Sequence, residues 1–193
     1  MKGWQGDAFE EPRGDEFETP RWLVELCVNE LNRFYFPELC VSILDPAAGR
    51  SVWANVLNEQ IKTLNYRISE CEINDDRGNF YDNYTIYNWV IGNPPFSNLT
   101  RWLEHSTKIA DTGIAYILPA HALSHKRLEI MESFGFTLCS IHSFRNPKEW
   151  QLGYPHFFCV WVNNFASNIV PQNHVMQGPA TNHSRQFRMT EWI

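Results

Sequence analysis

The sequence predicts an α/β fold with a mostly parallel sheet, and three observations carry this prediction. Short apolar runs alternate with amphipathic stretches from residue 41 to residue 162. Apolar residues make up 44% and charged residues 20% of the 193 positions, the composition of an ordinary globular domain. The apolar runs are also far shorter than the roughly 20 residues that cross a bilayer. We therefore expect a single compact domain without a membrane-spanning segment.

The N-terminal part of the domain predicts a helix, a strand and a second helix. Thr19 can cap a helix that begins at Pro20, where a missing amide donor costs nothing, and ends near Phe36. The apolar run 41–44 predicts a strand. Apolar side chains then recur with a period of about 3.6 residues over 52–61, which predicts the second helix.

The same alternation continues through the middle of the chain. Strands are predicted at 66–73, 86–91 and 113–119, and helices at 99–110 and 124–134. Alternating strands and helices indicate right-handed crossover connections and a parallel sheet that is covered by helices.

The last two predicted strands, 137–144 and 157–162, have no helix-length segment between them. They therefore predict an antiparallel hairpin at an edge of the sheet. Residues 1–14 are polar and are expected to form an N-terminal arm, while residues 166–193 carry no clear period and are expected to form a tail. The domain itself is expected to occupy residues 15–165.

Charge and cysteine content restrict the partners. The 16 basic and 22 acidic residues give a net charge of −6, the wrong sign for holding nucleic acid by phosphate contacts alone. The basic residues Lys126, Arg127, Arg145 and Lys148 could contact phosphates but are interpreted as solvated charges. The 5 cysteines lack metal-ligand spacing and the N-terminus lacks a secretory signal, so we expect no metal and a cytoplasmic location.

Three polar turns follow strands of the predicted sheet. In an open parallel sheet, ligands bind at the carboxyl ends of the strands, where the strand order reverses. The small residues of Asp45-Pro46-Ala47-Ala48-Gly49 would let a ligand approach the backbone, and Glu72 is placed as a ribose-hydroxyl acceptor would be. Both features also occur without function, as a plain turn and as a helix cap.

The third turn, Asn93-Pro94-Pro95-Phe96, is more specific. Its two prolines fix φ and remove backbone donors, which leaves the Asn93 carboxamide and the Pro94 carbonyl as rigid acceptors beside an exposed ring. His121 and His156 could face the same region but are interpreted as structural or solvated histidines. The segment 150–154 is either a substrate-facing loop or a plain hairpin connection.

These motifs carry a resemblance to a known family. Asn93-Pro94-Pro95-Phe96 resembles the catalytic tetrapeptide of S-adenosylmethionine (SAM)-dependent amino methyltransferases, above all the adenine-N6 DNA methyltransferases. Residues 45–49 resemble the methyl-donor loop of that family, and 15–20 resemble the segment that closes over the methionine moiety. Glu72 matches the acid that takes both ribose hydroxyls, and Gly78-Asn79-Phe80 resembles the element beside the adenine of the cofactor. The motif order is similar to the gamma-type arrangement, and compact phage-borne members look closest.

The resemblance implies a fold, a cofactor and a site. The fold would be a Rossmann-like class I methyltransferase domain with a mostly parallel seven-stranded sheet, an antiparallel edge hairpin and helices on both faces. The implied catalytic residues are Asn93, Pro94, Pro95 and Phe96. The implied SAM-binding residues are Phe17, Thr19, Pro20, Asp45, Pro46, Ala47, Gly49, Glu72, Asn79 and Phe80.

The chain departs from the family pattern at three places. Ser51 stands where a second glycine is expected in the donor loop, and Asn79 stands where an aspartate usually meets the exocyclic amine of the cofactor. Residues 166–193 are also too short for the target-recognition domain that many relatives carry.

The implied reaction needs no metal and no strong base. The lone pair of an aromatic-ring amine is delocalised, and the Asn93 oxygen and the Pro94 carbonyl would draw the amine toward tetrahedral geometry for attack on the methyl group. Phe96 would stack on an adenine that has left the duplex. The expected partners are DNA, preferentially single-stranded or distorted, and a protein partner or second copy that supplies target recognition. Methylation of RNA adenine or of a protein glutamine amide, and a non-catalytic binding subunit, are the alternatives.

Overall fold

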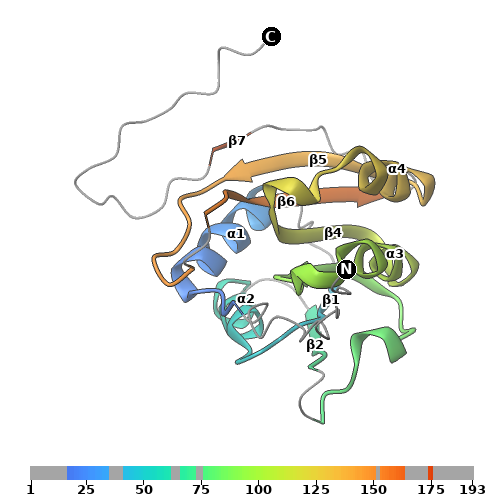
Figure 1. Ribbon diagram of the computed structural model, residues 1–193. Coiled ribbons are helices and arrows are strands. Elements are labelled where there is room, and N and C mark those ends of the chain that lie inside the picture. Colours follow the sequence, from blue (N-terminus) through green and yellow to red (C-terminus); the bar gives the residue numbers. More distant parts are fainter. Residues whose placement is uncertain are drawn as a thin grey trace, which may run out of the picture.

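The computed structural model describes residues 17–34, 41–61, 66–72, 76–150, 153–163 and 174–175 (Figure 1). The predicted arm 1–14, residues 15 and 16 of the donor segment, and most of the predicted tail lie outside these ranges. The helices are α1 (Arg21–Phe34), α2 (Val52–Gln60), α3 (Leu99–Ile109) and α4 (His125–Ser133). The strands are β1 (Val41–Asp45), β2 (Tyr66–Glu70), β3 (Tyr87–Gly92), β4 (Ala110–Pro119), β5 (Phe136–Ser143), β6 (His156–Asn163) and β7 (His174–Val175). Short 3₁₀ turns η1 (Phe80–Asp82), η2 (Phe96–Asn98) and η3 (Ala120–Ala122) complete the elements.

The strands form one sheet in the order β2-β1-β3-β4-β6-β5-β7, in which β6 alone runs antiparallel to its neighbours. This confirms the predicted mostly parallel α/β sheet. Helices α1 and α2 pack on one face, and α3 and α4 pack on the other (Figure 1). The two helical layers bury separate cores on the two faces, which is why the central strands are apolar on both sides.

The predicted hairpin is present, but its position in the sheet differs from the prediction. Strands β5 and β6 do pair antiparallel, yet β6 lies between β4 and β5 instead of at an edge. Residues 158–162 are buried at every position, so this strand is covered on both faces and belongs in the interior. Strand β7, which pairs with β5, lies in the segment that was expected to be a tail.

Local boundaries differ by small amounts from the predictions. The Pro20 carbonyl accepts from the amides of Leu23 (2.9 Å) and Val24 (3.3 Å), so Pro20, not Thr19, occupies the cap position of α1. Strand β2 ends at Glu70, and Glu72 forms an isolated bridge with Gly78. Within the described ranges, no helix is both long and apolar enough to cross a bilayer.

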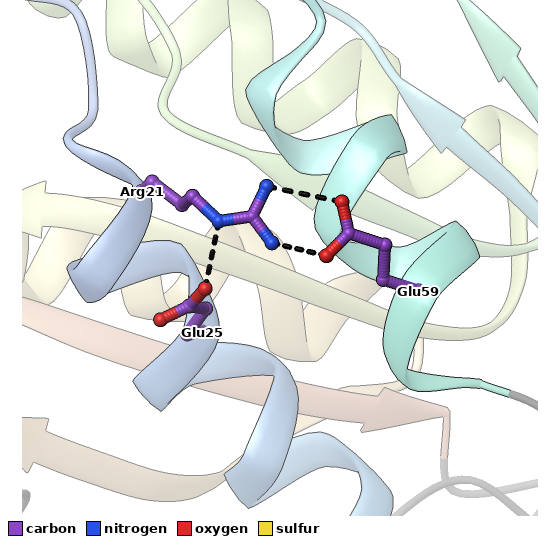
Figure 2. Close-up of polar contacts among 3 residues, drawn as sticks. All are labelled: Arg21, Glu25 and Glu59. Carbon is purple, nitrogen blue, oxygen red and sulfur yellow. Dashed lines mark hydrogen bonds and ion pairs between the residues drawn. The ribbon is translucent and has the colours of Figure 1, made fainter.

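An exposed ion-pair cluster joins α1 to α2. Figure 2 shows the Arg21 guanidinium between Glu25 of its own helix and Glu59 of α2. Arg21 Nε lies 2.8 Å from Glu25 Oε1, and the two terminal nitrogens face the two carboxylate oxygens of Glu59. Exposed pairs add little stability, so the relative position of the two helices depends mainly on the apolar core that they share. Each of these helices follows a segment of the candidate site, residues 17–20 before α1 and residues 45–51 before α2.

Candidate active site

The candidate site lies where the chain changes direction across the sheet. From β1 the chain crosses to β2 on one side and then returns to β3 on the other side. The carboxyl ends of β1 and β3 therefore flank the switch point, where open α/β sheets bind their ligands. Asp45 ends β1, Asn93 directly follows β3, and Glu70 pairs with Asp45 in register. All three sequence-predicted turns thus meet at one edge of the sheet.

The Asn93 side chain is oriented by the N-terminal segment. Its Nδ2 donates a 3.0 Å hydrogen bond to the carbonyl oxygen of Phe17. A carbonyl can only accept, so this contact places the amide nitrogen toward Phe17 and leaves Oδ1 on the other side. That Oδ1 is buried and has no hydrogen-bond partner. Asn93 therefore presents a single, fixed acceptor atom.

Four aromatic rings pack together at the turn, and each of them contacts two of the others. The Phe96 ring stacks on Phe17 (centroids 6.2 Å apart, 24° between planes) and lies 5.4 Å from the ring of His156. Trp150 is the fourth ring, with centroid distances of 6.2 Å to Phe17 and 5.1 Å to His156. Trp150 Nε1 also donates to the carbonyl of Glu18 (3.0 Å). The segment before α1 thus contacts the 93–96 turn through Phe17 and the Trp150 side chain through Glu18.

His156 is held in one tautomer. Asn146 Nδ2 donates to the Tyr154 carbonyl (2.7 Å), so Asn146 Oδ1 must be the acceptor that faces His156 Nδ1 at 3.1 Å. The proton therefore resides on Nδ1, and Nε2 is a buried acceptor without a hydrogen-bond partner. Burial, with a smaller contribution from His121, lowers the pKa of His156 to about 4. The ring is neutral at physiological pH.

Sequence reasoning did not select Trp150 or His156 as site residues. The structure places both against Phe96 and Phe17, and the 150–154 connection is more than an exposed hairpin loop. Residues 151 and 152 of that segment lie outside the described ranges. No local pattern distinguishes these side chains, because their proximity to the turn depends on β6 lying next to β4.

On the donor side of the edge, Asp45 is fully buried. Its Oδ1 accepts from the Ala47 amide (3.3 Å), while Oδ2 has no hydrogen-bond partner. Burial is the main cause that raises the pKa of Asp45 to about 8. Gly92 permits this packing, because a Cβ at that position would lie 2.9 Å from Asp45 Oδ1. In this neutral form the free Oδ2 carries the proton and is a donor, whereas a ligand group that donates hydrogen bonds or carries positive charge would favour the ionised carboxylate and lower the pKa again.

The turn after Asp45 is held by the segment that follows β2. Glu72 Oε2 accepts from the Gly49 amide (2.9 Å), which brings the predicted ribose acid to the predicted donor loop. Arg77 donates to the Gly49 carbonyl (2.7 Å) and to Ser51 Oγ (3.0 Å). Ser51 adopts a left-handed conformation with φ 61°. Arg77 was not predicted as a site residue, since a lone arginine in a polar loop gives no signal.

The side chains of the 78–80 element are engaged in local structure: one caps a 3₁₀ turn and one packs in the core. Asn79 Oδ1 accepts from the Tyr81 amide (3.0 Å) and so caps η1. Phe80 is buried and packs on Trp102, with ring centroids 4.3 Å apart, and against His105. In this structure the Asn79 side chain is used to cap η1, and the Phe80 ring is used in core packing.

No protein-family model and no curated protein sequence matches the chain. Solved structures do match. A Listeria monocytogenes protein assigned to the class I SAM-dependent methyltransferases superimposes with a TM-score of 0.65 at 12% identity, covering 81% of this chain and 64% of that one. The fold is that of the class I methyltransferases.

Two further methyltransferases support this fold assignment. The methyltransferase subunit of a type I restriction-modification system from Streptococcus thermophilus gives a TM-score of 0.55 at 14% identity, covering 77% of this chain and 45% of that one. Magnesium protoporphyrin IX methyltransferase from Synechocystis, solved with bound SAM, gives 0.51 at 13% identity, covering 73% and 76%. This chain spans less than two thirds of the length of the first and second of these three structures.

Three buried atoms at the carboxyl edge of this methyltransferase fold have no hydrogen-bond partner: Asp45 Oδ2, Asn93 Oδ1 and His156 Nε2. Other buried atoms without such partners, among them Glu30 Oε2, Gln60 Oε1 and Trp161 Nε1, lie elsewhere in the described structure. The position of the first three at the switch point of the sheet makes them candidate ligand contacts. Among the residues that the structure describes, no group of three or more His, Cys, Asp or Glu side chains could hold a metal ion.

Proposed function

We propose that this protein transfers a methyl group from SAM to the exocyclic N6 amine of adenine in DNA. The observation that carries the proposal is the buried, unpaired Oδ1 of Asn93, which the Phe17 carbonyl orients beside the Phe96 ring at the switch point of a methyltransferase fold. A fixed acceptor in a buried site stabilises positive charge that develops on an attacking amine, and it needs no reorganisation during the reaction.

The donor side of the site fits SAM. Glu72 lies at the Gly49 amide, where it can take ribose hydroxyls. The positively charged amino group of the methionine moiety would favour the ionised form of Asp45, whose Oδ2 could then accept from it. SAM, when bound, supplies the electrophilic methyl group. The proposed binding set is Phe17, Thr19, Pro20, Asp45, Pro46, Ala47, Gly49, Glu72, Asn79 and Phe80.

The acceptor side fits a planar, amine-bearing ring. Asn93 Oδ1 and the Pro94 carbonyl would accept from the two amine hydrogens, which leaves the lone pair directed at the methyl group. Phe96, with its neighbours His156 and Phe17, offers aromatic surface on which an extruded base can stack. One of the matching structures is the methyltransferase subunit of a type I restriction-modification system, and for this reason we choose adenine in DNA over RNA adenine or a protein glutamine amide as the substrate. Target recognition would come from a protein partner or a second copy of the chain.

Transfer of labelled methyl groups from SAM to DNA, RNA and protein tests the proposal. We expect label in DNA, recovered as N6-methyladenine, and loss of at least about a hundredfold in rate for Asn93→Ala with unchanged SAM affinity. Asn98→Ala is the matched control, because Asn98 is an exposed asparagine that makes no side-chain capping bond. Label confined to RNA or protein would refute the DNA substrate, and full turnover by Asn93→Ala would refute the role of the turn.

A further inference from the structure

The donor loop contains a residue in a conformation that its side chain disfavours. Gly49 and Ser51 both have positive φ, 48° and 61°, and Ser51 is the only non-glycine residue in this region among the described residues. A left-handed backbone crowds the Cβ atom of any residue except glycine. Contacts from elsewhere must therefore hold Ser51 in place.

Arg77 supplies these contacts. Its guanidinium donates to the Gly49 carbonyl at 2.7 Å and to Ser51 Oγ at 3.0 Å, so it bridges both ends of the left-handed segment. The Glu70 carboxylate lies 3.7 Å from the same guanidinium and balances its charge. Glu72 holds the amide of Gly49 (2.9 Å) while Arg77 holds its carbonyl. The two peptide groups on either side of the Gly49 Cα are thus each held by a side chain from the segment after β2.

We propose that Arg77 is a positioning residue for the cofactor loop, which it holds in the open left-handed conformation that SAM requires. The inference rests on the proposed function, because it takes residues 45–51 as the SAM-binding turn. The planar guanidinium of arginine carries several N–H donors and can bridge a carbonyl and a hydroxyl at the same time, whereas the ammonium of lysine is one compact charged group. Arg77 acts through the loop and makes no contact with the reacting atoms.

Calorimetric titration of SAM into four proteins tests the inference: wild type, Arg77→Ala, Ser51→Gly and the double variant. We expect Arg77→Ala to raise the Kd for SAM about tenfold, while kcat at saturating SAM stays within about twofold. In the Ser51→Gly background the same substitution should raise Kd by no more than about threefold, because glycine adopts the left-handed conformation without support. Arg67→Ala, which removes an exposed arginine of β2, is the control and should leave Kd unchanged.

Hydrogen exchange of the loop provides a readout that needs no cofactor. The Ser51 amide donates to the Ala48 carbonyl (2.7 Å), and its exchange should accelerate about tenfold in Arg77→Ala but not in Arg67→Ala. Arg77→Lys gives the same comparison if the alanine variant does not fold. An equal rise in Kd in both backgrounds, or unchanged Kd and exchange in Arg77→Ala, would overturn the inference. If wild type binds no SAM while exchange still responds to Arg77, the proposed function fails and the loop-holding role stands.

Discussion

At the residue scale, several polar side chains of the candidate site are buried without the hydrogen bonds or charge partners that would compensate for their burial. Asn93 Oδ1 and His156 Nε2 are buried acceptors without hydrogen bonds, and Asp45 is a carboxyl whose pKa is raised by burial. Each unsatisfied buried atom costs about 1–3 kcal/mol. All three lie at the carboxyl edge of the sheet, where a bound ligand could supply the missing partners.

The raised pKa of Asp45 makes stability depend on pH. The unfolded carboxyl ionises near its ordinary value of 3.8, but the folded one stays protonated up to about pH 8. Between these values the folded state binds the extra proton, so stability falls as pH rises. Asp45→Asn keeps an acceptor oxygen and cannot ionise. Its free energy of unfolding, minus that of wild type, should rise by about 1.4 kcal/mol per pH unit between pH 5 and 7 and level off above pH 8.

Urea denaturation across this pH range measures the difference, and a variant with a stability curve parallel to wild type would contradict the prediction. His156 has the opposite sign, since burial lowers its pKa to about 4 and favours the folded state as pH rises from 4 to 6.5. It is present in both proteins and therefore cancels in the difference.

The hydrogen bond from Trp150 to the Glu18 carbonyl offers a second test at this scale. Trp150→Phe keeps an aromatic ring but removes the Nε1–H donor, so we expect a loss of about 1 kcal/mol beyond the effect of the smaller ring. Trp53→Phe is the matched control, because Trp53 is equally buried and its Nε1 has no partner. Equal free energies of unfolding for the two variants would show that the bond contributes nothing.

At the scale of elements, the central strands depend on close packing between neighbours. Strands β3 and β4 pair Trp89 with Gly113, and the indole fills the space where a side chain of residue 113 would stand. Trp89 is completely buried in the core beneath α1 and α2. The absence of a side chain at Gly113 is what lets the Trp89 ring pack against β4.

Gly113→Ala should destabilise the protein by about 3 kcal/mol, at the upper end of overpacking effects. The added Cβ would lie 2.3 Å from the Trp89 ring, and the ring is held on all sides by the core. Gly153→Ala, where a Cβ meets nothing within 4 Å, should change the free energy of unfolding by less than about 0.5 kcal/mol. Thermal or urea unfolding compares the two. Similar stability of both variants would mean that β3 and β4 can separate without penalty.

At the scale of the whole molecule, charge limits how the protein can engage nucleic acid. The chain carries −6, and Arg127, one of the basic side chains that could contact phosphates, donates to Thr100 Oγ1 and to the carbonyls of His121 and Ala122. An arginine used in this way holds η3 and α4 to α3. We infer that few phosphates are neutralised by the chain alone.

Isolated protein should therefore bind DNA weakly, and the logarithm of affinity should fall with the logarithm of salt concentration with a slope of only about −2 to −3. Single-stranded or distorted oligonucleotides should bind better than matched duplexes, because extruding an adenine from them costs less. Salt-titrated fluorescence anisotropy with both substrates measures this. Tight, steeply salt-dependent duplex binding by the isolated chain would refute the expectation that a partner or second copy supplies the basic surface.

The features that could be predicted without the structure are those that local spacing along the chain encodes. Strand and helix periods, the proline turn at 94–95 and the polar residues at strand ends all depend on neighbours within one element or turn, so the α/β alternation and the three turns at one edge were predictable. Three features depend on the tertiary structure: β6 lies inside the sheet, Trp150 donates to Glu18 across 132 residues, and Arg77 donates to Gly49 and Ser51. Such contacts depend on the order of the strands in the sheet. That order is determined by how entire apolar faces of the sheet and helices become buried, and a short stretch of sequence does not specify it.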